Sequence, residues 1–170
     1  ANPVYGRPVS PLDATRSPGG SSGGGAAALA AAMVALEMGS DLYGSVRVPA
    51  HFCGLYGHKP SVGVLPTRGH DFPGTQMEPG DRPAVIGPLA RCAEDLDLVM
   101  DAIAGPDLPD AKAYRLALPP ARHSQLRDWR VLVLDQHPAC TTSQALRGVL
   151  DTLARDLERA GAKVARHSEC

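Results

Sequence analysis

The sequence of 170 residues is poor in aromatic residues, in lysine and in long apolar runs. Aromatic residues make up only 4%, so a core has to be built mainly from Ala, Val and Leu. No run of about 18 apolar residues occurs, so we predict no membrane segment. Three lysines, scattered arginines and a formal net charge of -1 argue against a nucleic-acid partner, because phosphate backbones are bound by clustered basic side chains.

The cysteines do not indicate a metal site or a disulfide framework. The four cysteines lie far apart, with no C-x-x-C pair and no Cys/His spacing typical of a metal site: Cys53, Cys92, Cys140 and Cys170. A chain of this length and apolar content does not need a disulfide scaffold. We therefore expect reduced thiols, a cytoplasmic location and no metal.

Gly and Pro are abundant instead, with 18 and 16 residues. The chain starts with Ala and stops without a terminating element, so we expect a fragment of a longer protein. Residues 1–25 and 64–84 are predicted loops. The Ala-rich run 26–38 predicts a buried helix ending at Gly39, and a short strand is expected near Val46–Val48.

The C-terminal part has clearer periodicity. Apolar residues at helical spacing predict a helix over 93–104, with two acidic residues in its first turn. A compact apolar run at 130–134 predicts a strand, Ser143 is placed to cap a helix, and 162–165 is a second candidate strand. This order predicts a βαβ unit and an α/β fold.

The segment Gly19–Gly25 reads G-G-S-S-G-G-G, a pattern that is compatible with several kinds of loop. A flexible linker would not normally run into a buried helix. A phosphate-binding loop of the nucleotide type needs a Lys that is absent here. A nucleophile elbow fits G-x-S-x-G, but it must follow a hydrophobic strand, and the residues before Pro18 are polar.

A fourth interpretation uses the residues beyond the helix. P-G-G-S-S-G-G-G, the Ala-rich run, D-L-Y-G-S-V-R-V-P-A and F-C-G-L-Y-G-H-K-P-S together resemble the amidase signature family. Ser21 and Ser45 are 24 positions apart, the spacing of that family. The likeness continues through G-P-L-A-R and A-G-P-D, covering residues 1–107 well and 108–170 loosely. Two blocks at fixed separation are far more specific than one glycine-rich loop.

The resemblance implies an amidase signature fold, with a mixed central sheet flanked by helices and an incomplete core. It covers 1–170 as a partial domain, with the Ser/Gly-rich catalytic core at 1–107 and a continuation at 108–170. It implies a Ser–cis-Ser–Lys triad in which Ser45 is the nucleophile and Ser21 the bridging serine with a cis peptide bond. The family's lysine lies upstream of Ser21, outside this sequence, and Lys59 matches a structural G-x-K-P stretch instead. We therefore expect the 170 residues alone to be inactive.

The supporting residues are also carried over by the resemblance. The backbone amides of Leu42, Tyr43, Gly44 and Ser45 match an oxyanion hole, in which N–H donors stabilise the tetrahedral intermediate. Ser22, Asp41 and Arg47 match positions that support the site. Tyr43 stands where the family usually has Gly, and a positive φ there would penalise a bulky residue.

The implied activity is hydrolysis of a small-molecule amide through an acyl-serine, without cofactor or metal. The stretch from Gly57 to Pro73 favours a stand-alone bacterial amidase similar to fatty-acid amide hydrolases. One alternative is the glutaminase-type subunit of a tRNA-dependent amidotransferase, and another is a non-catalytic homologue that acts as a binding module. The sequence does not specify the amide substrate, and it leaves homo-oligomer formation open.

Overall fold

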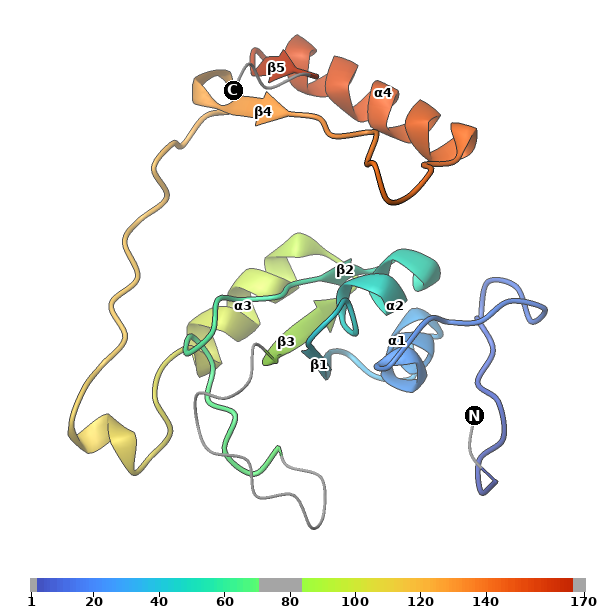
Figure 1. Cartoon of the computed structure of the whole chain (residues 1–170). Helices are drawn as coiled ribbons and strands as arrows, with labels where there is room; N and C mark the ends of the chain where they lie inside the picture. Colours follow the sequence, from blue (N-terminus) through green and yellow to red (C-terminus); the bar gives the residue numbers. More distant parts are fainter. Residues whose placement is uncertain (1–2, 71–83, 167–170) are drawn as a thin grey trace. The chain divides into compact units, whose positions relative to one another are not determined.

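The computed structural model describes residues 3–70 and 84–166 (Figure 1). The chain divides into two compact units, 1–117 and 118–170. Both units combine helices with a small sheet, so the predicted α/β class is confirmed.

The first unit is built around a three-stranded antiparallel sheet. Its strands are β1 (Glu37–Asp41), β2 (Tyr56–Gly57) and β3 (Val85–Ala90), in the spatial order β1-β3-β2. β3 is the central strand and is buried along almost its whole length. β1 ends at Asp41, which lies opposite Val85, and the chain turns there into the segment that carries Ser45.

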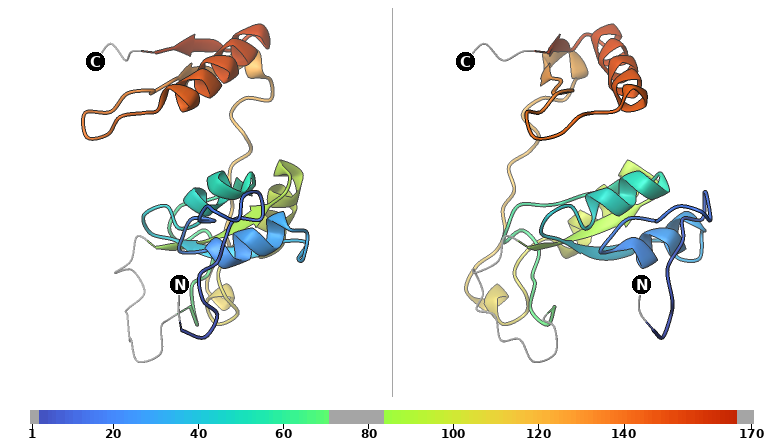
Figure 2. Two further views of the ribbon diagram at one scale, coloured as in Figure 1. Left: turned by 90° about the vertical axis from the view of Figure 1, so that its right-hand side faces the viewer. Right: turned by 45° about the vertical axis from the view of Figure 1, so that its right-hand side comes forward.

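Two short helices pack against each other and against this sheet (Figure 2). They are α1 (Gly23–Ala30) and α2 (Arg47–Cys53). Inward side chains of the two helices, the residue before α2 and one residue of β3 form the core of the unit: Ala26, Leu29, Val46, Ala50, Cys53 and Leu89. The members are mostly small, as the shortage of aromatic residues predicts, and they hold α1 and the start of α2 close together.

The predicted helix over 26–38 is wrong at both ends. α1 begins three residues earlier and stops at Ala30, and the chain then reverses through Ala32, whose φ is +57°. The Arg91 guanidinium donates to the carbonyls of Leu29 (3.2 Å) and Val34 (2.8 Å), which satisfies acceptors exposed by the early helix end. Residues 37–41 pair with β3 instead, so tertiary pairing overrides the helix propensity of Ala, Leu and Met.

Two further predictions about these segments need correction. Burial of the helix on all sides is not observed, since only Gly23, Ala26 and Leu29 of α1 are buried. The strand expected at Val46–Val48 is not formed, since Val46 ends the preceding turn and α2 begins at Arg47. Pro49 is compatible with that helix because it lies in the first turn, where amides have no intrahelical acceptor.

The helix predicted over 93–104 is confirmed as α3 (Ala93–Ile103), which follows β3 and contacts it. After α3, a short 3-10 helix, η1 (Asp110–Lys112), is joined to the loop at Arg68 by ion pairs from Arg68 to Asp107 and Asp110. Part of the predicted loop 64–84 lies outside the described residues, namely 71–83.

The second unit confirms the predicted βαβ order. It contains η2 (Leu126–Asp128), β4 (Arg130–Leu132), α4 (Gln144–Arg159) and β5 (Lys163–Ala165), with β4 and β5 parallel. Ser143 caps α4 as expected, since its hydroxyl accepts from the amide of Leu146 at 3.3 Å. Gly161 takes a φ of +94° between α4 and β5.

Within the described part of the chain, no helix is long and apolar enough to cross a membrane. The three cysteines that the structure describes, Cys53, Cys92 and Cys140, are free thiols. Cys170 lies outside the described residues.

Candidate functional site

The glycine-serine segment forms a tight turn that leads into α1. The peptide bond between Gly20 and Ser21 is cis, the conformation that the resemblance implies for Ser21. Gly19 has a φ of +81°, and a Cβ at this position would lie 3.0 Å from the Cα of Pro49 in α2. Glycine is therefore required at position 19 both for its conformation and for the close approach of α2.

A second turn, residues 42–46, connects β1 to α2 and carries Ser45. Asp41, fully buried at the end of β1, organises this turn with its carboxylate. One oxygen accepts from the amide of Gly44 (2.8 Å), and the other accepts from the amides of Val46 (3.1 Å) and Arg47 (3.3 Å). The carboxylate thus fixes the turn and satisfies free amides at the start of α2.

The Arg47 side chain binds the same carboxylate with two hydrogen bonds. Its Nε donates to Oδ2 at 3.0 Å and its Nη2 donates to Oδ1 at 2.9 Å, a bidentate geometry. The side chain of Arg47 is 53% exposed, whereas that of Asp41 is 0% exposed. These bonds hold the pKa of Asp41 well below its usual range, with the guanidinium as the main cause and burial acting in the opposite direction.

The two serine turns contact each other through their backbones. The amide of Ser22, the residue after Ser21, donates to the carbonyl of Ser45 at 3.1 Å. Ser21 is exposed and Ser45 is half-buried. The structure thus brings together the segments of the two expected catalytic serines, one of which precedes α1 while the other follows β1.

The expected oxyanion-hole amides differ in their hydrogen bonding. The Gly44 amide already donates to Asp41. Among the described residues, no acceptor is found for the amides of Leu42, Tyr43 and Ser45. These three amides, in the turn that carries Ser45, are therefore available to donate to a bound group.

The structure explains how a tyrosine is accommodated at position 43, where the resemblance leads us to expect a glycine. Tyr43 does not have a positive φ, and the left-handed position of this turn is Gly44, with a φ of +113°. The Tyr43 side chain is 89% exposed. The turn therefore accommodates a bulky residue at position 43 without the backbone penalty that a positive φ would bring.

Some residues that shape this site are not apparent from the sequence. Arg91 joins the end of β3 to the α1–β1 connection, and Gly39 lies between the two serine turns. Arg91 is visible in the sequence only as part of G-P-L-A-R, and the local pattern at Gly39 indicates a helix end. Their roles depend on contacts between distant segments, which the local pattern does not encode.

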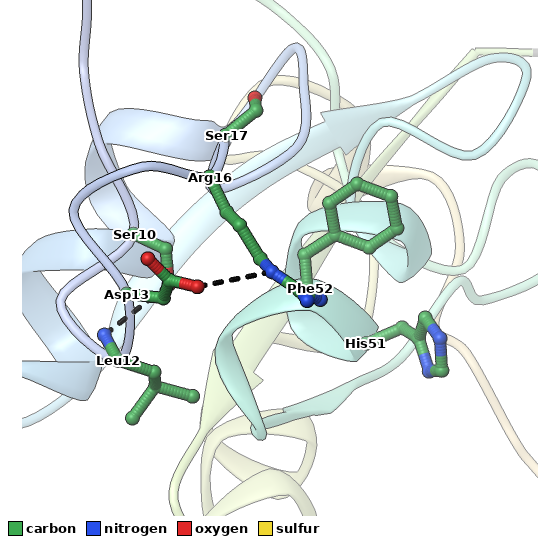
Figure 3. Close-up of a pocket in the computed structure, with 7 residues that line it drawn as sticks. All are labelled: Ser10, Leu12, Asp13, Arg16, Ser17, His51 and Phe52. Carbon is green, nitrogen blue, oxygen red and sulfur yellow. Dashed lines mark hydrogen bonds and ion pairs between the residues drawn. The ribbon is translucent and has the colours of Figure 1, made fainter.

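A cavity of about 520 Å³ lies between the turn at residues 10–17 and the last turn of α2 (Figure 3). The cavity is lined by Ser10, Leu12, Asp13, Arg16, Ser17, His51 and Phe52. An ion pair of 3.0 Å between Arg16 and Asp13 crosses this turn. Ser21 and Ser45 are not among the lining residues, so the cavity is distinct from the serine turns.

Comparison with known proteins assigns the family. The sequence matches the Amidase family over residues 1–168. The chain belongs to this amidase family.

Solved amidase structures are correspondingly similar to it. Fatty acid amide hydrolase gives a TM-score of 0.79 at 26% identity, covering 99% of this chain and 30% of that one. A bacterial aryl acylamidase of the amidase signature family gives 0.77 at 28% identity, covering 96% and 33%. The predicted amidase signature fold is thereby confirmed.

Proteins with similar sequences include an amidotransferase subunit and a fatty-acid amide hydrolase. The A-subunit of the glutamyl-tRNA(Gln) amidotransferase of Thermus thermophilus is 50% identical over 111 residues, which are 65% of this chain and 22% of that protein. Fatty-acid amide hydrolase 2 of Homo sapiens is 43% identical over 114 residues, which are 66% of this chain and 21% of that protein. The amidase chain thus spans about a fifth of the length of these relatives.

Proposed function

We propose that this chain supplies the serine half of the active site of an amidase, in which Ser45 attacks a carboxylic amide and Ser21 relays the proton. The observation that carries the proposal is the hydrogen bond between the Ser22 amide and the Ser45 carbonyl, which fixes the two serine turns side by side. The buried Asp41, which holds the turn around Ser45, supports it. Positioning of this kind is what a nucleophile needs, because small displacements reduce rates strongly.

The chemistry follows from the weakness of a serine hydroxyl as a nucleophile, which requires an adjacent base. We propose that a neutral lysine from outside these 170 residues accepts the proton of Ser21, and that Ser21 accepts the proton of Ser45. Ser45 Oγ then forms a bond to the amide carbon, and the amides of Leu42, Tyr43 and Ser45 stabilise the oxyanion. Return of the proton through Ser21 releases the amine, and water hydrolyses the acyl-serine.

The same mechanism predicts that the 170 residues alone do not turn over amides. Lys59, Lys112 and Lys163 are the lysines of the chain, and Lys59 matches a structural stretch of the family. The following tests therefore use the full-length protein that contains this chain.

A fluorophosphonate probe, which reacts with activated serines, tests the proposal without knowledge of the substrate. We expect one stoichiometric adduct, located on Ser45 by peptide mass spectrometry. Denatured protein is the control, since an unactivated serine does not react. An adduct on another serine would contradict the role of Ser45, and absence of any adduct would favour a non-catalytic binding module.

The oxyanion turn gives a second prediction, based on Gly44. Gly44→Ala places a side chain at a φ of +113° and a Cβ 3.0 Å from Cγ2 of Val48. We expect kcat to fall by roughly 10-fold or more, because a left-handed alanine costs about 1–2 kcal/mol and shifts the turn. Gly24→Ala in α1 is the matched control and should change kcat by less than about twofold, since Gly24 has no positive φ and an added Cβ would meet no atom within 4 Å. If the control variant lowered kcat more than Gly44→Ala does, the oxyanion donors would not lie in the turn of residues 42–46.

A second candidate function is the glutaminase-type subunit of a tRNA-dependent amidotransferase. It is favoured by the amidotransferase relative from Thermus thermophilus at 50% identity. The stretch Gly57–Pro73 favours a stand-alone amidase, although residues 71–73 lie outside the described part. Purification of the full-length protein from its source distinguishes the two: a stable complex and tRNA-dependent glutamine hydrolysis indicate the amidotransferase, and turnover by the isolated protein indicates the amidase.

A further inference from the structure

Two glycines face each other in the middle of the sheet, Gly39 in β1 and Gly87 in β3. Neither has a positive φ, so backbone conformation alone does not require glycine at either position. Glycine inside a strand weakens it unless another segment approaches closely. The contacts around Gly39 identify that segment.

The space that a Gly39 side chain would fill is taken by both serine turns. An added Cβ would clash with Oγ of Ser22, and it would lie 2.9 Å from Cβ of Ser22 and 3.0 Å from Cγ2 of Val46. Carbon atoms in contact normally lie about 3.5–4.0 Å apart. A methyl group at position 39 would therefore push Ser22, Val46 or both away from β1.

Both displaced residues are direct neighbours of the proposed catalytic serines. Ser22 follows Ser21, and Val46 follows Ser45. The hydrogen bond from the Ser22 amide to the Ser45 carbonyl joins the same two turns. Val46 is fully buried in the core, so it has little freedom to move aside. A shift at Ser22 would thus change the placement of Ser21 relative to Ser45.

We propose that Gly39 is a positioning residue, whose missing side chain lets the Ser21 and Ser45 turns meet at the distance that proton transfer needs. This inference rests on the proposed function, because it takes Ser45 as the nucleophile and Ser21 as the bridging serine. Gly39 is not one of the proposed reacting residues, and it acts through Ser22, whose side chain would make the shortest contacts with an added Cβ.

A nearby glycine provides the matched control. A Cβ at Gly25 in α1 would meet the side chain of Glu37, with contacts of 2.5 Å to its carboxylate end. That side chain is half-buried and flexible, so it is able to rotate away. Gly25→Ala therefore adds the same methyl group at a short contact without displacing either serine turn.

The test compares Gly39→Ala with Gly25→Ala in the full-length protein. The rate constant of fluorophosphonate labelling at Ser45 measures the reactivity of the nucleophile, and kcat and KM are measured on a simple primary amide. For Gly39→Ala we expect labelling and kcat to fall by roughly 10-fold to 100-fold, with KM within about twofold, since a displacement near 1 Å has effects of this size. Gly25→Ala should stay within about twofold in all three quantities.

A rescue experiment separates positioning from a general loss of stability. Ser22→Gly removes the Cβ and Oγ that the new methyl group would meet. We therefore expect Gly39→Ala to lower the labelling rate by less than about threefold in a Ser22→Gly background, even if the single variant folds poorly. An unchanged labelling rate in Gly39→Ala, or an equal loss in both backgrounds, would overturn the inference. A wild-type protein that does not label at Ser45 would instead contradict the proposed function.

Discussion

Ser45→Ala is expected to abolish amide hydrolysis by the full-length protein while leaving its fold intact. Removal of the nucleophile from a serine hydrolase lowers kcat by a factor on the order of 10⁶, because the acyl intermediate no longer forms. The fold should persist because Ser45 takes part in the packing of the turns through its backbone carbonyl, which alanine retains. Steady-state turnover of a primary amide and the circular dichroism spectrum measure the two effects.

The matched control for this variant is Ser61→Ala. Ser61 is exposed, and only its backbone carbonyl has a hydrogen-bond partner among the described residues, the amide of Val64. Turnover should therefore remain within about twofold of the wild type. If Ser45→Ala kept more than a few per cent of the activity, Ser45 would not be the nucleophile and the proposed mechanism would be wrong.

The site can be predicted from the sequence to the extent that it depends on spacing. Ser21 and Ser45 stand out because two motifs lie at a fixed separation, and the cis bond before Ser21 and the contact from Ser22 to Ser45 agree with that interpretation. The way in which Asp41 acts is not visible in the sequence. Its five hydrogen bonds to three amides and one guanidinium arise only once β1 ends at Asp41 and α2 begins at Arg47.

The errors in the fold prediction lie in the same region and have a common cause. Residues 26–38 have the composition of a helix, but the helix stops at Ala30 and β1 begins at Glu37. Residues 46–48 have the composition of a strand, but α2 begins at Arg47. Pairing of β1 with β3 and the carboxylate of Asp41 at the start of α2 decide the outcome. α3 and α4 agree with their predictions, because their periodicity and capping residues are local signals.

The ion pair between the buried Asp41 and the exposed Arg47 explains how a turn rich in polar backbone groups is held in place beside a small core. A carboxylate that is fully buried is costly unless its oxygens are satisfied, and here every bond that satisfies it also fixes the turn of Ser45. The structure therefore couples the stability of the first unit to the geometry of the site. A change at Asp41 should affect both together.

Asp41→Ala is accordingly expected to lower the free energy of unfolding by about 1–3 kcal/mol, the usual cost of leaving buried backbone donors without an acceptor. The exposed Arg47 guanidinium adds little to this loss, because water replaces its acceptor. The variant leaves the amides of Gly44 and Val46 and the Arg47 guanidinium without their acceptor. Denaturant unfolding followed by circular dichroism measures the loss. Asp97→Asn, which changes an exposed carboxylate on α3, is the control and should lie within about 0.5 kcal/mol of the wild type. A loss below about 1 kcal/mol for Asp41→Ala would show that the pair does not hold the turn.

The pH dependence of stability gives an independent test of the same pair with Asp41→Asn. Because the pKa of Asp41 is lowered on folding, its ionised form stabilises the folded state above the unfolded pKa of about 3.9, and this contribution is lost as the pH falls below that value. The difference in unfolding free energy between wild type and Asp41→Asn should thus be constant above about pH 5 and should shrink on acidification. A difference that stayed constant down to pH 3 would mean that the Asp41 carboxylate is not stabilised by folding, and the account of how Arg47 and the amides hold the Ser45 turn would have to be abandoned.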